Sequence, residues 1–268
     1  MTRVAAHRGG ALLWPENSLL AFRQAQALGC DFVEFDVHAT ADGEVAVIHD
    51  ATLDRTSEGT GPVASMKAAD LRRLRLREAD GGLTDERVPR LEDVLAVVAP
   101  SPVALLVEVK GPAPGFGVRW ERVGGRAVAA PGPCYEGLED RVLSALGRAG
   151  LLERATLMAF NPDVLARVRA RLPGQRTALL VAAHHAAQAD AGPEETIDWA
   201  VAAGATDVGL QHTLVNEAVV RAARRAGVRL GVWTVNDEPA MRRLADLGVD
   251  VLTSDRPDLA LRAVRRAP

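Results

Sequence analysis

The chain has 268 residues and a mass of 28.4 kDa, a size that either one large α/β barrel or two small domains can reach. Hydrophobic residues make up 48% of the chain and charged residues 25%, which excludes a disordered protein and allows a large core. Because the formal net charge is -3 and aromatic residues are only 4%, the composition disfavours a nucleic-acid partner.

Short apolar and β-branched runs recur along the chain and predict eight strands, at residues 3–6, 31–37, 103–109, 155–160, 177–181, 207–211, 229–235 and 249–253. Between most of these runs lie apolar residues at helical spacing, such as Val164, Leu165 and Val168. Several predicted helices end at a glycine just before the next strand, as at Gly204 and Gly227.

This repeat of strand, helix and glycine predicts a TIM-type (β/α)8 barrel. Parallel strands need helical crossovers, and near-continuous apolar strands must be covered on their outer face. A doubly wound open sheet is the alternative, but the chain has neither a GxGxxG nor a GxxxxGK phosphate loop to support it.

One further strand, at residues 45–49, follows the second predicted strand too closely for a crossover helix. It must therefore return as an antiparallel hairpin. The pair Asp42-Gly43 predicts a two-residue turn at the tip. This register places His49 directly across from Asp36.

Two segments lie outside the repeat. After the hairpin strand that carries His49, residues 50–88 or so predict a small insertion above the barrel, with a helical pattern at 66–76. Residues 111–137 are rich in glycine and proline, and a loop of this length is either a functional lid or a mobile excursion. We predict that residues 1–268 form a single domain that contains both segments.

Targeting and redox features are sparse. No apolar run approaches the roughly 18 residues of a membrane span, and no signal-peptide core precedes His7. We therefore expect a cytoplasmic protein without stable membrane insertion, and its oligomeric state stays open. Cys30 and Cys134 form neither a CxxC pair nor a zinc spacing, which favours small buried apolar residues over chemistry.

Carboxylates gather near the carboxyl ends of two predicted strands, where barrel enzymes place their catalytic groups. Glu34 and Asp36 are two residues apart and share one face of a strand, and Glu108 ends the next barrel strand. Three carboxylates at one mouth repel unless a cation lies among them, and oxygen ligands suit Ca²⁺ or Mg²⁺. Salt bridges with Arg8 and Lys110 are the alternative.

Histidine and basic side chains accompany these carboxylates. His7 and His49 can act as general base and general acid, because the ordinary histidine pKa is about 6.5. Arg8 offers a fork of donors for a phosphate, and Lys110, one of only two lysines in the chain, adds a second positive charge. This set is typical of phosphoryl transfer without a protein nucleophile.

In these motifs and their order the sequence resembles the glycerophosphodiester phosphodiesterase family. The matching segments are His7-Arg8-Gly9-Gly10, Pro15-Glu16-Asn17-Ser18 with Ala21-Phe22, Glu34-Phe35-Asp36-Val37, Val47-Ile48-His49-Asp50, Thr52-Leu53-Asp54-Arg55-Thr56, Glu108-Val109-Lys110, Val232-Trp233-Thr234-Val235-Asn236 and Thr253-Ser254-Asp255-Arg256-Pro257. They extend from residue 7 to residue 257, which is nearly the whole chain.

The resemblance implies a barrel with a small insertion and metal-dependent hydrolysis of glycerophosphodiesters, such as glycerophosphocholine or glycerophosphoethanolamine. The products would be sn-glycerol 3-phosphate and an alcohol, formed through a cyclic phosphate. Carried onto matching positions, the acid/base pair is His7 and His49, the ligands of one Ca²⁺ or Mg²⁺ ion are Glu34, Asp36 and Glu108, and the phosphate contacts are Arg8 and Lys110.

Roles are also expected for other residues in and beside the matching segments. Trp233 either packs on the glycerol carbons of the substrate or fills the core, and Glu16 is expected to orient Arg8 or His7. Asn17 or Ser18 is expected to cap the following helix. His38, further along the strand of Asp36, is expected to be solvated or to lie at the substrate rim.

Two other functions stay open. The same barrel acting on lysophospholipids, sphingomyelin or phosphoinositides would need an exposed apolar rim, for which residues 111–137 offer Phe116, Trp120 and Tyr135. A binding barrel that has lost catalysis would be expected to lack a histidine or a carboxylate of the set, and none is missing.

Overall fold

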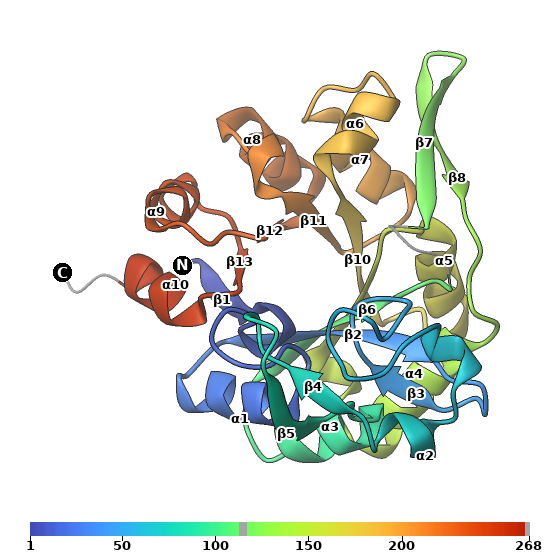
Figure 1. The fold of residues 1–268 in the computed structure, drawn as a ribbon. Coiled ribbons are helices and arrows are strands. Elements are labelled where there is room, and N and C mark those ends of the chain that lie inside the picture. The colour runs from blue at the N-terminus through green and yellow to red at the C-terminus, as the bar shows by residue number, and fades with distance from the viewer. Residues whose placement is uncertain (113–116, 266–268) are drawn as a thin grey trace.

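The computed structural model describes residues 1–112 and 117–265 (Figure 1). Eight parallel strands close into a barrel, because β1 pairs with β13 on one side and with β2 on the other. The predicted TIM-type fold is therefore confirmed. In order around the barrel, the strands are β1 Arg3–Ala6, β2 Phe32–Ala39, β6 Ala104–Val109, β9 Ala155–Ala159, β10 Arg176–Val181, β11 Asp207–Gln211, β12 Arg229–Trp233 and β13 Val251–Ser254.

Helices surround the barrel and cover its outer face (Figure 1). In α8, for example, Val219, Val220 and Ala223 are buried, and the helix ends at Gly227 with φ 69°, as its sequence predicts. The α-helices are α1 Leu19–Ala27, α2 Ala68–Leu71, α3 Leu91–Val98, α4 Leu138–Arg148, α5 Pro162–Arg171, α6 Ala183–Gln188, α7 Glu195–Ala202, α8 Glu217–Ala226, α9 Glu238–Leu247 and α10 Pro257–Val264. Short 3₁₀ helices are η1 His7–Gly9, η2 Val63–Ser65, η3 Leu152–Arg154 and η4 His212–Leu214.

The antiparallel hairpin forms between β2 and β3 (Val45–Val47), but its predicted register is wrong by one residue. Ile48, and not His49, lies opposite Asp36, and its N–H donates to the Asp36 carbonyl over 3.0 Å. The tip holds three residues because Gly43 has φ 79° and the Thr40 hydroxyl satisfies nearby polar groups. His49 therefore lies beyond the end of β3.

The insertion after β3 contains less helix than the sequence predicts. In place of a helix over 66–76, α2 covers four residues and the chain turns into a second hairpin, β4 Arg75–Arg77 with β5 Leu83–Arg87. The apolar side chains of the insertion do not line one face of a helix. They form a separate small core against β3 and the residues that follow it. The buried members of this core are Ala46, Ile48, Leu53, Val63, Leu71, Leu76 and Val88.

Within the glycine- and proline-rich segment, β7 Val118–Val123 and β8 Arg126–Pro131 pair as a hairpin. The hairpin stands at the right-hand edge of Figure 1. Trp120 is buried and stacks on Trp199 of α7, with ring centroids 3.9 Å apart. Trp120 is therefore not part of an exposed apolar rim, and Phe116 lies outside the described residues.

No helix of the described residues is both long enough and apolar enough to cross a bilayer.

The Trp120 stack is expected to hold the hairpin on the barrel. Trp120→Ala removes a large buried ring and should raise amide hydrogen exchange across β7 and β8 at least about tenfold, because buried apolar contacts limit local opening. The matched control is Val123→Ala, since Val123 is 58% exposed. Unchanged protection of β7 and β8 in Trp120→Ala, measured by mass spectrometry, would contradict this prediction.

Candidate active site

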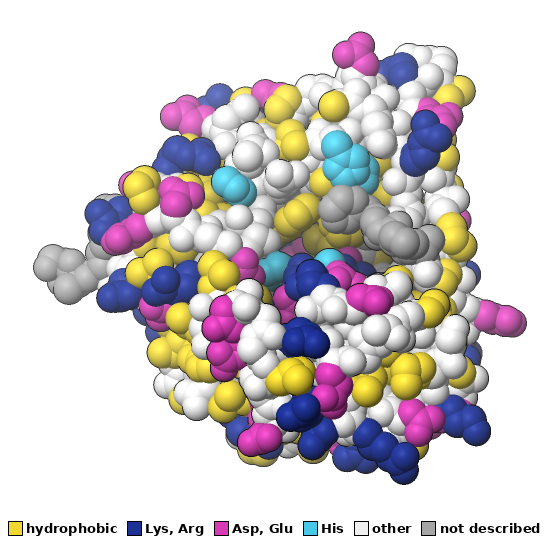
Figure 2. Space-filling view, in the orientation of Figure 1, with side chains coloured by type: hydrophobic (Ala, Val, Ile, Leu, Met, Phe, Trp, Pro, Cys, Tyr) yellow, Lys and Arg dark blue, Asp and Glu magenta, His cyan; other side chains and the backbone are white. Residues whose placement is uncertain are grey.

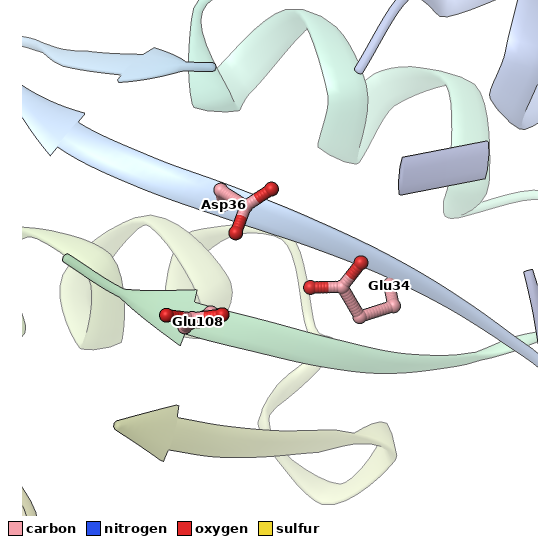
Figure 3. Close-up of side chains that lie close together, drawn as sticks. All are labelled: Glu34, Asp36 and Glu108. Atoms are coloured by element: carbon pink, nitrogen blue, oxygen red, sulfur yellow. The ribbon is translucent and has the colours of Figure 1, made fainter. Parts of the chain in front are cut away.

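The carboxyl ends of β2 and β6 bring three carboxylates together (Figure 3). The strands pair in parallel with Asp36 opposite Glu108, and Glu34 lies on the same face of β2 as Asp36. Each residue offers an oxygen, and these oxygens all lie within 4.8 Å of one another. All three side chains are buried, so the barrel pairing itself places like charges in a confined space.

Burial and mutual repulsion separate the pKa values of this cluster. Burial, reinforced by the negative charge of Asp36, raises the pKa of Glu34 to about 8. Burial also acts to raise the pKa of Asp36, but Lys110, His49 and Arg8 more than offset it and hold that pKa well below its usual range. Without a cation, Glu34 therefore carries a proton at neutral pH while Asp36 is ionised.

Lys110 gives the carboxylates a cationic neighbour. Its Nζ lies 3.0 Å from Asp36 Oδ1 and 2.6 Å from Glu108 Oε1. Burial acts to lower the pKa of Lys110, but Asp36 and Glu108 raise it above its ordinary value. The ion pairs considered from the sequence are therefore present alongside the carboxylate cluster.

The cluster also suits a hard divalent cation. All three residues supply oxygen ligands, and two of these oxygens, Asp36 Oδ1 and Glu108 Oε1, already contact a positive charge at Lys110 Nζ. A cation would favour the ionised form of Glu34, whose pKa is raised in its absence. The residues present therefore fit the predicted metal site.

His7 lies in η1 directly after β1. Its Nδ1 is 2.6 Å from Asp255 Oδ1, and Asn236 Nδ2 donates to the other Asp255 oxygen over 2.7 Å. A carboxylate only accepts, so the His7 proton is on Nδ1 and Nε2 is left as the acceptor. That Nε2 is on the side of the carboxylates, 3.9 Å from Glu34 Oε2.

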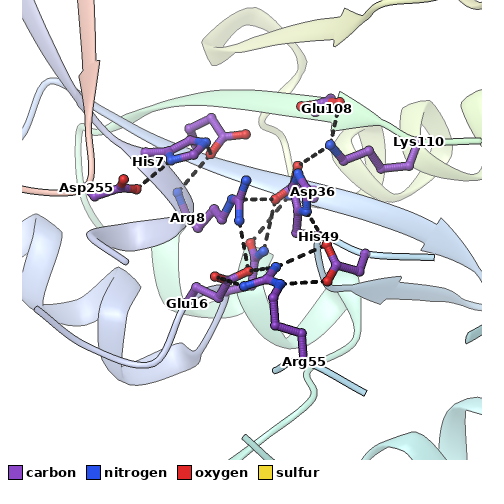
Figure 4. Close-up of polar contacts among 12 residues, drawn as sticks. His7, Arg8, Glu16, Asp36, His49, Arg55, Glu108, Lys110 and Asp255 are labelled. Carbon is purple, nitrogen blue, oxygen red and sulfur yellow. Dashed lines mark hydrogen bonds and ion pairs between the residues drawn. The ribbon is translucent and has the colours of Figure 1, made fainter. Parts of the chain in front are cut away.

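His49, which lies beside Asp36 in Figure 4, has the same kind of support. Its Nδ1 is 2.6 Å from Asp50 Oδ1, and Arg55 Nε donates to Asp50 Oδ2 over 2.7 Å. The hydrogen bond from His49 and the contact with Arg55 lower the pKa of Asp50 against its partial burial. Each histidine thus has one nitrogen fixed on an aspartate and the other free for proton transfer.

Glu16 joins the two basic residues of the loop region. It accepts from Arg8 Nη1 over 3.1 Å and takes a bidentate contact from Arg55 over 2.8 Å and 2.9 Å. Arg8 Nε lies 3.6 Å from Asp36 Oδ2. Of the two partners expected for Glu16, Arg8 is the one it contacts in this arrangement (Figure 4).

The backbone after His7 explains the two glycines of the first motif. Gly9 has φ 83°, and a Cβ there would lie 2.6 Å from Ala21 Cβ on α1. A side chain at this position would push the loop away from the helix. The close approach lets the Arg8 N–H donate to Glu34 Oε2 over 2.8 Å.

Sequence reasoning gave no role to three residues that support this site, Asp255, Asp50 and Arg55, and it gave Asn17 a role only as a helix cap. Asp255 and Asp50 bind the histidines, Arg55 binds Asp50, and Asn17 Nδ2 donates to Asp36 Oδ2 over 3.0 Å. Ser18, rather than Asn17, caps α1. Two of these residues could have been found from their places in the motifs, because Asp50 directly follows His49 and Asp255 directly follows the last barrel strand.

The expectation that His38 is solvated or lies at the substrate rim is wrong. It is buried, with Nδ1 3.0 Å from the Tyr135 hydroxyl and Nε2 3.0 Å from the His49 carbonyl oxygen. Burial lowers the pKa of His38 to about 4, so it is neutral. The segment after β8 covers it, and that long-range contact has no sequence pattern.

A cavity opens between His7 and His49 and extends into the barrel, with a volume of about 240 Å³. Figure 2 shows this hollow in the face where histidine, acidic and basic side chains gather. Trp233 lines the cavity and is half-buried. Its Nε1 donates to the Gly209 carbonyl over 2.9 Å, and its ring packs edge-on against Phe160.

The class of protein follows from where these groups converge. Histidines set for proton transfer, oxygen ligands for a cation and two basic side chains meet at the mouth of a barrel, which is the arrangement of a hydrolase of phosphate esters. Comparison with known proteins gives the family. The model of the glycerophosphoryl diester phosphodiesterase family matches residues 7–259, and the chain belongs to this family.

Individual relatives agree over nearly the whole chain. A glycerophosphodiester phosphodiesterase of Caldanaerobacter subterraneus is 28% identical, over 99% of this chain and 98% of its own length. One of Bacillus subtilis is 30% identical, over 95% of this chain and 83% of its own length.

Solved structures share the fold. A putative glycerophosphoryl diester phosphodiesterase from Agrobacterium tumefaciens has a TM-score of 0.84 at 29% identity, covering 99% of this chain and 98% of its own. An Oleispira antarctica phosphodiesterase, solved with the product sn-glycerol-3-phosphate, has a TM-score of 0.75 at 23% identity, covering 99% of this chain and 97% of its own.

The contact between Asp255 and His7 predicts a positioning effect. Asp255→Asn keeps the size of the side chain, but its amide can donate to Nδ1 and favour the wrong histidine tautomer. We expect kcat for glycerophosphodiester hydrolysis to fall at least about 100-fold with KM changed less than about threefold. Asp258→Asn on α10 is the matched control, and a wild-type kcat for Asp255→Asn would contradict the prediction.

Proposed function

We propose that this protein hydrolyses glycerophosphodiesters, such as glycerophosphocholine or glycerophosphoethanolamine, to sn-glycerol 3-phosphate and an alcohol. The observation that carries the proposal is the pair of histidines, each with Nδ1 2.6 Å from an aspartate, which line one cavity together with the buried carboxylates Glu34 and Glu108. Membership in the family supports the substrate class. The product bound to the Oleispira phosphodiesterase is the product proposed here.

His7 and His49 act as the acid/base pair in this proposal. One Nε2 accepts the proton of the glycerol hydroxyl next to the phosphoester as that oxygen bonds to phosphorus. The other histidine donates a proton to the departing alcohol oxygen as its bond to phosphorus breaks, which leaves a cyclic phosphodiester. In the second step water opens the ring and the histidines exchange roles, so each regains its starting protonation.

Arg8 and Lys110 hold the phosphate oxygens in this scheme. Glu16 keeps the Arg8 guanidinium in place, and Lys110 lies beside the carboxylates, so both positive charges are positioned before substrate arrives. Preset charges of this kind stabilise a developing negative charge without reorganisation. Trp233 packs against the carbon atoms of the substrate from the cavity wall.

Glu34, Asp36 and Glu108 would hold one divalent ion, Ca²⁺ or Mg²⁺. When bound, such an ion neutralises negative charge that develops on the phosphoryl oxygens. The cluster of buried carboxylate oxygens within 4.8 Å of one another supports this part of the proposal. We further propose that residues 1–268 act as one domain, because the insertion and the β7–β8 hairpin both pack onto the barrel.

The acid/base proposal is tested by substitution of each histidine. His7→Ala and His49→Ala should each lower kcat at least about 100-fold, since each removes a proton-transfer group. The assay measures sn-glycerol 3-phosphate released from glycerophosphocholine with Ca²⁺ or Mg²⁺ present. His212→Ala, outside the cavity lining, is the matched control. A near-wild-type rate for His7→Ala or His49→Ala would remove that residue from the mechanism.

The raised pKa of Glu34 predicts that cation binding releases a proton. At pH 7 Glu34 is protonated in the free protein because its pKa is about 8, and it must ionise to bind the cation. Cation affinity should therefore rise with pH through 7 and level off above 8. Calorimetric titration of Ca²⁺ at pH 7 in two buffers of different ionisation enthalpy measures the proton directly, and heats independent of the buffer would contradict the prediction.

A further inference from the structure

We propose that the barrel interior below the mouth is a pocket for an uncharged aliphatic group of the substrate. This inference rests on the proposed function, because a phosphodiester held at the mouth would direct one of its substituents into the barrel. The pocket is the inner part of the cavity already described. It differs from the mouth in its lining and in its charge.

Part of the interior is open because three of the residues that face it are small. The core of a TIM barrel is normally filled by layers of bulky side chains. Here Gly209 of β11 lies directly opposite Gly231 of β12, and Ala178 of β10 lines the same cavity. A Cβ on Gly231 would make only ordinary van der Waals contacts, the nearest at 3.7 Å, whereas a Cβ on Gly209 would lie 2.5 Å from Leu180 Cδ2. The room for added atoms is therefore beside Gly231.

The β12 strand shows that this space is accessible. Arg229, Gly231 and Trp233 point to the cavity and are partly exposed, whereas Leu230 and Val232 between them are buried. The exposure therefore lies inside the barrel and follows the two-residue period of the strand. The cavity runs past Gly231 from Trp233 at the mouth to Arg229 at the opposite end.

The charges at the inner end argue against a cationic group. Below Glu34 and Glu108, Asp207 is the one carboxylate among the described residues that line the cavity. It already accepts from Arg229 Nε over 2.6 Å and from Arg176 Nη2 over 3.0 Å. A choline or ethanolammonium group would therefore meet two arginines and no unpaired carboxylate among these residues.

The rest of the cavity wall is suited to an apolar hydrocarbon group. Between the mouth and Asp207, the lining is aliphatic apart from threonine hydroxyls, and it comprises Leu106, Thr156, Met158, Ala178, Leu180, Val208, Val251 and Thr253. The whole cavity of about 240 Å³ exceeds the apolar space of about 150 Å³ that holds a benzene molecule in another protein. A short alkyl chain fits both the size and the chemistry of this space.

The length of the pocket limits the length of the alkyl chain that it can hold. Trp233 lies four residue steps along the strand from Arg229, which corresponds to about 13 Å. An alkyl chain that fills the pocket would reach the ion pairs of Asp207 and go no further. The optimum chain length is therefore short, well below that of a membrane lipid.

The test is a series of glycerophosphoalkanols with ethyl, butyl, hexyl and dodecyl groups on the alcohol. We expect kcat/KM to rise up to about fourfold for each added methylene as the pocket fills, and then to fall for dodecyl. A second arm uses 1-hexanoyl-sn-glycero-3-phosphocholine, which carries the chain on the glycerol and shows which side of the diester enters the barrel. Equal kcat/KM for ethyl and hexyl esters, with no preference for the hexanoyl compound, would overturn the proposal.

Substitutions that fill the pocket give an independent readout. Gly231→Leu, and Ala178→Leu on another strand in case the first variant does not fold, should lower the ratio of hexyl to ethyl kcat/KM at least about tenfold. Ala202→Leu, on the exposed end of α7, is the matched control and should keep the wild-type ratio. A wild-type ratio in folded variants of both pocket positions would contradict the assignment.

Failure of the pocket and failure of the proposed function are distinguishable. If no glycerophosphodiester is hydrolysed, the proposed function fails, and the pocket is then tested by calorimetric binding of hexyl phosphate against ethyl phosphate. The pocket is supported without any turnover if hexyl phosphate binds more tightly than ethyl phosphate and Gly231→Leu abolishes this difference. Equal binding of the two phosphates overturns it.

Discussion

The structure depends on one electrostatic constraint, the confinement of Glu34, Asp36 and Glu108 at the adjoining ends of β2 and β6. Strand pairing fixes Asp36 opposite Glu108, and the barrel closes around them, so they cannot move apart. Like charges in a buried site are tolerated only with protonation or with positive neighbours. Both occur here, since the pKa of Glu34 is raised and Lys110 contacts the other two carboxylates.

The surrounding polar groups form an ordered set around this cluster. Asp255 and Asp50 orient the two histidines, and Glu16 connects Arg8 with Arg55. All of them except Asp255 lie within the first 55 residues, and Asp255 reaches the site from the other end of the chain because β1 lies beside β13 in the closed barrel. Closure of the barrel thus completes the proposed acid/base pair, and a disturbance of the last strand would reach the site through Asp255.

Much of this arrangement could be predicted from the sequence, because strand ends in a barrel share one mouth. The eight strands were predictable from apolar runs, and the paired spacing of Glu34 and Asp36 was enough to place them on one face. One failure concerned the length of a local turn, and two others depended on contacts distant in sequence. The turn at Gly43 has three residues, the segment of Tyr135 covers His38, and Trp120 stacks on Trp199. The open interior depended on Gly209 lying beside Gly231, which only strand pairing shows.

The central claim, that the confined carboxylates hold a divalent cation, is tested most directly by a crystal structure determined after soaking with Ca²⁺. The account predicts an ion within about 2.3–2.6 Å of an oxygen from each of Glu34, Asp36 and Glu108. It also predicts loss of that ion in crystals of the Asp36→Asn variant. Occupied Ca²⁺ elsewhere at the mouth, with Lys110 still bound between Asp36 and Glu108 in the soaked crystal, would contradict it.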